Sequence, residues 1–271
     1  MIFWLIIDFF LVLLLISFLI PVPVTDKGAV RYRSVPWMTV GLIATNSVAY
    51  LFWQKPPEAG GEINSFIDHI WSYSSQYDMV AYRYGIGGFS TFTGMFMHAD
   101  SSHLIGNMVY LWAFGRRVED ACGPWRFLLF YLVAGTVATM GYYFIVSDHL
   151  PGVGASGAIS GVMGAYMVLF PGARVGCLWM GFAILRGVLI GLARVIGLHF
   201  TFRWLVYIPA FVVLLFHVGW DVISTLETAE TGEMLGGVNY VAHTAGFLSA
   251  VTVLLFVRKD LFVRYFSGRR I

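Results

Sequence analysis

Apolar blocks of about twenty residues run through this chain, and they restrict its fold more than any other feature. The sequence is 58% hydrophobic and 12% charged, whereas about a quarter of the residues in soluble domains are charged. A spanning helix needs ~20 mostly apolar residues, and in lipid the backbone satisfies its own hydrogen bonds only in helices or closed barrels. The chain is therefore predicted to be an all-α polytopic membrane protein.

The blocks predict one N-terminal helix followed by a group of six. The first covers residues 1–20 and is read as retained, because it has no basic leading region and no small-residue cleavage site. The stretch 175–200 is apolar but interrupted by Arg186 and Arg194, so it is expected to lie flat in the interface. The other six spans are expected near residues 35–53, 103–114, 127–146, 154–170, 204–220 and 237–257.

The charges support this topology. With the linker before residue 35 in the cytoplasm, all of the 17 Lys and Arg except Lys55 and Arg83 lie on the cytoplasmic side, and ten of the 15 acids lie outside. The chain then divides into an N-terminal helix with its linker (1–34), a six-helix domain (35–257) and a basic cytoplasmic tail (258–271).

Several classes of protein are excluded. Cys122 and Cys177 are the only cysteines, so neither a disulfide framework nor a cysteine-rich metal site is expected. A net charge of +2 without a basic groove does not indicate nucleic-acid binding. No His-Glu-x-x-His run is present. Asp8 is the only acid expected well inside a span, so an aspartyl pair is not expected either.

Residues 152–165 combine small side chains with an apolar run. Ser156 stands there between Gly154 and Gly157. Small residues at four-residue spacing let membrane helices approach closely, so tight packing explains the stretch without any chemistry. The same setting leaves backbone amides accessible around a serine, which suits a nucleophile. The stretch alone does not choose between these two interpretations.

The predicted topology places polar groups from three helices at one depth. His98, His103, Ser156 and His243 all fall within two turns of the external face, and Asn107 lies one turn below His103. A serine with a neutral imidazole is the minimum for acyl transfer. His103, Asn107 and the Ser156 amide are candidate oxyanion donors. No carboxylate is evident to orient His243, so a Ser-His dyad is predicted.

The remaining candidates have simpler interpretations. His217 has no evident companion and is expected to be structural. Chelation of a metal by His98 and His103 lacks a third ligand, so no metal or other cofactor is expected. Gly246 and Ala250 share a helix face with His243, which predicts close packing of that helix against the Ser156 helix.

These motifs resemble the rhomboid family of intramembrane serine proteases. Gly154-Ala-Ser-Gly157 matches the family's Gly-x-Ser-Gly nucleophile motif. The run from His98 to Met108 matches the second core helix, and Ala242-His-x-x-Gly246 matches the sixth. Weaker matches are Glu119 through Arg126-Phe127 and Pro171-x-Ala-Arg-Val175.

The resemblance implies a six-helix bundle with a water-filled cavity open to the external side. Ser156 would be the nucleophile, His243 the base, and His103, Asn107 and the Ser156 amide the oxyanion donors. His98, Gly154, Gly157 and Gly246 would support them, while the fifth core helix and the loop 221–236 would form a mobile gate. Substrates would be single-span membrane proteins in the lipid bilayer. Oligomeric state stays open.

Some positions depart from the family pattern. Ser160 stands where an aromatic residue often stacks on the catalytic histidine, and Ala250 replaces a common glycine. A catalytically silent protein that binds transmembrane helices is therefore the alternative function. A transporter is disfavoured, because no internal repeat is found. A bacterial inner membrane is expected, since no organellar transit peptide is evident.

Overall fold

The computed structural model describes residues 20–27, 35–146, 150–231 and 238–257, with scattered positions between 7 and 18. Asp8, most of the predicted helix 1–20 and the whole predicted tail 258–271 lie outside the described residues. The extra N-terminal helix and the cytoplasmic tail therefore stay predictions.

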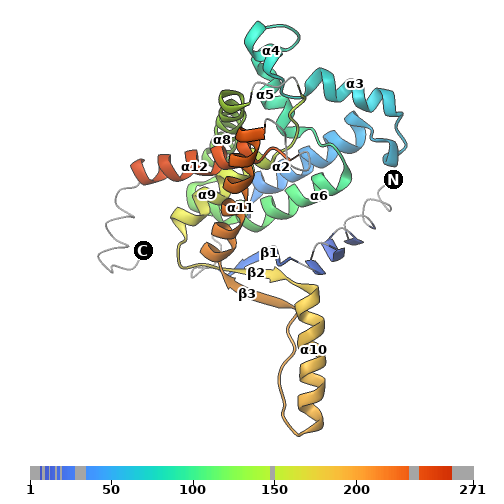
Figure 1. Cartoon of the computed structure of the whole chain (residues 1–271), viewed down its shortest axis with the longest axis vertical. Coiled ribbons are helices and arrows are strands. Elements are labelled where there is room, and N and C mark those ends of the chain that lie inside the picture. The colour runs from blue at the N-terminus through green and yellow to red at the C-terminus, as the bar shows by residue number, and fades with distance from the viewer. Residues whose placement is uncertain are drawn as a thin grey trace.

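Helices make up most of the described chain and form a bundle above a small sheet (Figure 1). Three helices are long and apolar enough to cross a membrane, namely α8, α11 and α12, among the residues described. The principal helices are α2 (Trp37–Val48), α6 (Ser101–Tyr110), α7 (Arg116–Cys122), α8 (Pro124–Ile145), α9 (Ser156–Leu169), α11 (Ala210–Thr231) and α12 (Tyr240–Val257). π-Helical turns extend α2 through Ala49–Gln54 and join α6 to α7 through Leu111–Gly115.

Most of the predicted spans coincide with these helices. Helices α8, α9 and α12 begin and end within three residues of the ends of their predicted spans. The predicted spans 35–53 and 103–114 are also mostly helical. Helix α11 differs, because it starts at Ala210 and continues to Thr231. Much of the predicted loop 221–236 is therefore helical, and Asp221 lies inside a long apolar helix rather than after it.

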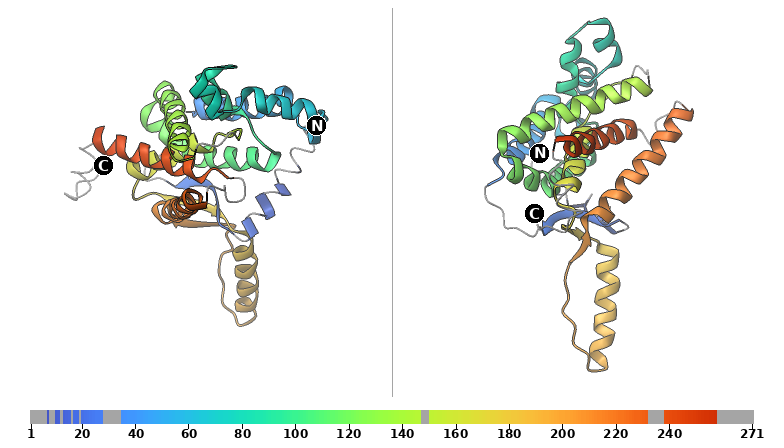
Figure 2. Two further views of the ribbon diagram at one scale, coloured as in Figure 1. Left: turned by 45° about the horizontal axis from the view of Figure 1, so that its top comes forward. Right: turned by 90° about the vertical axis from the view of Figure 1, so that its left-hand side faces the viewer.

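Helix α9 lies at the centre of the bundle and packs against both α8 and α12, which also contact each other (Figure 2). Every residue from Gly157 to Tyr166 is buried. A methyl group added at Gly161 would lie 2.6 Å from Cβ of Ala134 on α8, and one added at Gly164 would lie 2.6 Å from the carbonyl oxygen of Phe247 on α12. Small residues thus let three helices pack at backbone distance, which confirms the predicted closure of α12 on the Ser156 helix.

The segment between α2 and α6 braces the loop that precedes α9. It contains α3 (Ile63–Tyr73), α4 (Tyr77–Tyr82) and the single turn α5 (Ser90–Thr93). Ser75 exchanges backbone hydrogen bonds of 2.9 and 2.7 Å with Gly152, and the Gly94 carbonyl accepts one of 2.9 Å from the Gly154 amide. The conformation of residues 152–154 is therefore set by residues some 60 to 80 positions earlier.

A three-stranded antiparallel sheet lies at one end of the bundle and was not predicted. Its order is β1 (Val22–Lys27), β2 (Arg174–Leu178), β3 (Leu205–Pro209). The prediction of an all-α chain is therefore wrong in this detail. Three short segments, far apart in sequence, satisfy their backbone groups by pairing with one another, and periodicity in one segment cannot reveal such partners.

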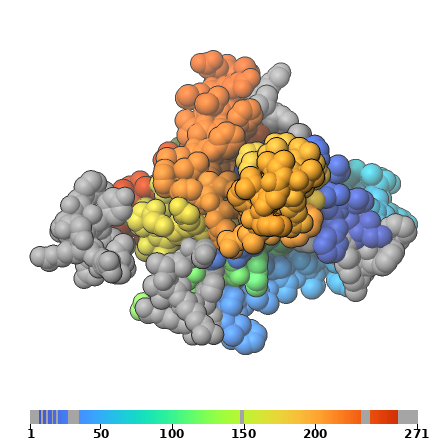
Figure 3. Space-filling model, turned by 90° about the horizontal axis from the view of Figure 1, so that it is seen from below, coloured from blue at the N-terminus to red at the C-terminus, as the bar shows by residue number. Residues whose placement is uncertain are grey.

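The segment 175–200, which is expected to lie flat in the membrane interface, contains strand β2 and a helix. After β2 the chain forms α10 (Met180–Val195), which projects from the sheet, and it returns to β3 (Figures 1 and 3). Leu185, Leu189 and Leu192 are exposed on α10, with Arg186 and Arg194 on the same helix. Its position flat in the membrane interface stays a prediction.

Candidate active site

Ser156 is the first residue of α9 and is partly exposed, whereas the residues on either side of it are buried. The first amides of a helix have no partner inside the helix, and the helix dipole places partial positive charge there. A serine at this position therefore stands beside backbone donors suited to a developing negative charge.

His103 and Asn107 lie on one face of α6, one turn apart, as predicted. Asp100 caps this helix, because its carboxylate accepts a 2.8 Å hydrogen bond from the His103 amide. Burial raises the pKa of Asp100, but hydrogen bonds from Ser102 and the His103 amide outweigh burial and leave that pKa below its ordinary value. The Asp-Ser-Ser-His order is a helix-start signal, so the cap could have been found in the sequence.

Gly154 links the serine loop to α6. Its φ is +117°, and a Cβ there would lie 2.7 Å from both Cε1 and Nε2 of the His103 ring. Only glycine combines this backbone conformation with so close an approach. The buried Nδ2 of Asn107 has no hydrogen-bond partner among the described residues, so this donor is available to a ligand.

His243 lies in the first turn of α12. Asn239 begins this helix, and its Oδ1 accepts a 2.9 Å hydrogen bond from the Ala242 amide. The Tyr240 ring packs edge-to-face on His243 at 6.0 Å between centroids. An aromatic neighbour is thus supplied from the same helix, while Ser160 is buried in α9.

The four predicted groups meet in one cavity. Ser156, His243, His103 and Asn107 all line a space of about 490 Å³. No hydrogen bond joins Ser156 to His243 in the part of the chain that the structure describes. Hydrogen bonds between catalytic residues are often long before substrate binds, so the absence of one here does not exclude a catalytic serine–histidine pair.

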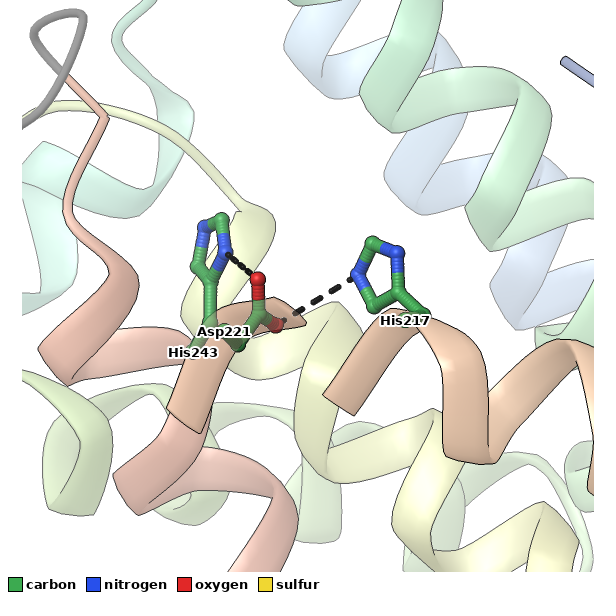
Figure 4. A group of neighbouring side chains, drawn as sticks. All are labelled: His217, Asp221 and His243. Atoms are coloured by element: carbon green, nitrogen blue, oxygen red, sulfur yellow. Dashed lines mark ion pairs between the residues drawn. The ribbon is translucent and has the colours of Figure 1, made fainter. Parts of the chain in front are cut away.

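Asp221 is the residue that the sequence reading missed. Its Oδ1 lies 3.6 Å from Nδ1 of His243 and its Oδ2 lies 3.6 Å from Nε2 of His217 (Figure 4). The expectations that His217 has no companion, that Asp8 is the only acid inside a span and that no carboxylate faces His243 are therefore wrong. The sequence signal for the contact between His217 and Asp221 is their His-x-x-x-Asp spacing, which places both side chains on one helix face.

His98 lies behind the cavity rather than in it. It is fully buried, its ring packs on His103 at 5.2 Å between centroids, and its backbone exchanges two 3.0 Å hydrogen bonds with the Gln54 side chain. Gly157 and Gly246 meet at the α9–α12 contact, where a Cβ on Gly246 would overlap the Gly157 carbonyl. These residues hold the helices and rings in place.

Comparison with known proteins agrees with this arrangement. A family model described as "Rhomboid domain" matches residues 87–260, which contain every residue that lines the cavity near Ser156. The chain belongs to the rhomboid family. With its long apolar helices, this rhomboid is an integral membrane protein.

Curated relatives of this rhomboid come from several sources. It is 27% identical over 143 residues to "Rhomboid protein 1, mitochondrial" of Saccharomyces cerevisiae, covering 51% of this chain and 38% of that protein. It is 37% identical over 86 residues to "Putative rhomboid protease YdcA" of Bacillus subtilis (31% and 43%) and 28% identical over 139 residues to "Presenilin-associated rhomboid-like protein A, mitochondrial" of Danio rerio (50% and 33%). The chain thus spans less than half of each.

Proposed function

We propose that this rhomboid is an intramembrane serine endopeptidase that cuts transmembrane helices near the external membrane face. The observation that carries the proposal is the shared cavity, in which a serine at a helix N-terminus, a histidine from another helix and two polar side chains from a third lie together. Relatives named as rhomboid proteases support the same conclusion.

In the proposed reaction, Oγ of Ser156 attacks the scissile carbonyl carbon while Nε2 of His243 takes the hydroxyl proton. The negative oxygen of the tetrahedral intermediate accepts hydrogen bonds from the Ser156 amide, Asn107 and His103. His243 returns the proton to the leaving amine, and water then hydrolyses the acyl-enzyme ester by the same steps. Because the backbone donors of α9 are already fixed, they stabilise the intermediate without reorganisation.

Asp221 extends the proposed dyad. A carboxylate facing Nδ1 favours the tautomer with hydrogen on Nδ1, which leaves Nε2 free to accept a proton. At 3.6 Å the contact is too long for a good hydrogen bond, so Asp221 acts as an electrostatic and positioning group. A small shift of α11 during substrate entry would shorten it.

The proposed substrate is a single-span membrane protein that enters beside α11. A second, largely apolar cavity of about 660 Å³ lies between α6, α11 and β1, and it shares His217 and His243 with the cavity near Ser156. An apolar helix thus has a lipid-like route to the serine. We place the protein in a bacterial inner membrane with the serine cavity on the external side; cell fractionation tests this against a mitochondrial membrane.

Probe labelling separates a protease from a silent helix-binding protein. A fluorophosphonate probe is expected to label the purified wild type and to fail on Ser156→Ala and His243→Ala. Ser72→Ala is the control, because this exposed serine lies on α3, outside the cavity, and should leave labelling intact. Absence of labelling in a folded wild type that still crosslinks a transmembrane peptide would establish the silent alternative.

A further inference from the structure

His217, Asp221 and His243 form a compact cluster of metal-ligating groups across two helices. The ligand atoms offered by the three side chains all lie within 4.8 Å of one another. Asp221 stands between the two rings, at 3.6 Å from a nitrogen of each (Figure 4). A cation held here would bind to α11 and α12 at once.

The spacing fits one class of cation better than others. With Zn–N and Zn–O bonds of about 2.0–2.1 Å, tetrahedral geometry places neighbouring ligand atoms about 3.3–3.4 Å apart. The two 3.6 Å contacts use different carboxylate oxygens, Oδ1 toward His243 and Oδ2 toward His217. With one ligand atom from each residue, all separations are within 4.8 Å, so the three side chains must close in on the ion to reach this edge length. Two imidazoles and one carboxylate suit Zn²⁺, whereas Mg²⁺ and Ca²⁺ prefer oxygen ligands.

Independent features of the cluster also indicate a ligand. Nδ1 of His243 is buried and has no hydrogen-bond partner within the described ranges, although it faces the Asp221 carboxylate. His217 and His243 line both cavities, so a hydrated ion and its fourth ligand, a water, have room. Asp100 and Ser102 at the edge of the cavity near Ser156 provide a polar entry path.

We propose that His217, Asp221 and His243 bind Zn²⁺ and that the bound ion inhibits the protease. The inhibition part rests on the proposed function, whereas binding does not. A metal on Nδ1 of His243 requires that nitrogen to be unprotonated, so the ring proton moves to Nε2. Nε2 is then a donor and cannot accept the proton of Ser156.

Binding is tested on the full-length Ser156→Ala protein in detergent, purified without a polyhistidine tag. Co²⁺ is the probe, because tetrahedral Co²⁺ gives visible absorption bands that Zn²⁺ should abolish by displacement. His217→Gln and His243→Gln are each expected to weaken Co²⁺ affinity at least about tenfold. His69→Gln on α3 is the matched control and should bind Co²⁺ like the parent. Absence of tetrahedral bands, or unchanged bands in both variants, would overturn the proposal.

Inhibition is tested separately on protein that retains Ser156. Zn²⁺ should reduce cleavage of a transmembrane substrate, a chelator should restore it, and His217→Gln should need at least about tenfold more Zn²⁺ for the same fractional loss. Each variant is compared with its own zinc-free rate. Cobalt binding without any cleavage in wild type would reject the proposed protease and leave the metal site standing. Cleavage that Zn²⁺ does not affect would reject inhibition.

Discussion

The Oδ1 of Asp221 lies 3.6 Å from Nδ1 of His243, so α11 and α12 meet through the imidazole that we propose as the base. The same carboxylate faces His217, whose ring packs on Tyr110 of α6 at 5.5 Å between centroids. A chain of side chains therefore runs from α6 through α11 to α12. Because α11 lies next to the apolar cavity, movement of this helix would change the orientation of His243.

Asp221→Asn is expected to lower kcat for a transmembrane substrate by about 10- to 100-fold with little change in KM, since the amide no longer favours the reactive tautomer or the imidazolium. Steady-state cleavage over a range of substrate concentrations in detergent measures both constants. Glu227→Gln removes an exposed carboxylate from the same helix and serves as the control. Equal kcat in the two variants would show that Asp221 does not orient the base.

Gly154→Ala is expected to reduce cleavage by about tenfold or more while the protein remains folded. The residue has φ +117°, and its new Cβ would lie 2.7 Å from the His103 ring, so the oxyanion donors must shift. Gly172→Ala is the matched control, because no atom lies within 4 Å of its added Cβ. If Gly154→Ala cleaves substrate at the wild-type rate, then His103 can move without slowing the reaction.

Gly246→Ala is expected to lower the free energy of unfolding by about 1–3 kcal/mol, because overpacking separates α12 from α9. The added Cβ would overlap the Gly157 carbonyl oxygen. Thermal denaturation in one detergent measures the effect. Gly219→Ala on α11 meets nothing within 4 Å and should leave stability unchanged or slightly raised. Similar melting temperatures for both variants would contradict close packing at Gly246.

Most helices of the bundle could be predicted from the sequence. The same is true of four residues that line one cavity, namely Ser156, His243, His103 and Asn107. Apolar length locates α8 and α12 because a lipid environment leaves few alternatives. The predicted topology places Ser156, His103 and His243 at one depth in the membrane, because each stands near the start of a helix. These features depend on local pattern and on topology, both of which a single sequence contains.

Other features depend on partners that no local pattern identifies. Strand β1 pairs with β2 about 150 residues later, and its own short sequence, with Pro23, Asp26 and Lys27, is typical of a linker. Glu227 and Glu230 predict that Asp221 begins a polar loop, yet α11 continues past both glutamates. Gly232 directly follows the last residue of α11, so the glycine stop that marks this helix end is present in the sequence.

Asp26→Asn is expected to destabilise the protein by about 3–5 kcal/mol, since the buried guanidinium of Arg117 loses the negative charge that faces it. Nε of Arg117 lies 2.7 Å from the Asp26 carboxylate, which also accepts a 3.4 Å hydrogen bond from Tyr166 of α9. The contact therefore joins the sheet to the central helix.

Denaturation of Asp26→Asn is compared with that of Asp68→Asn, which neutralises an exposed acid on α3. The double variant Asp26→Leu, Arg117→Met should recover part of the loss, because it removes both charges of the 2.7 Å pair and leaves only Arg116, which lies 3.7 Å from Asp26. A single variant as stable as the Asp68→Asn control would show that this ion pair does not hold the sheet to the bundle.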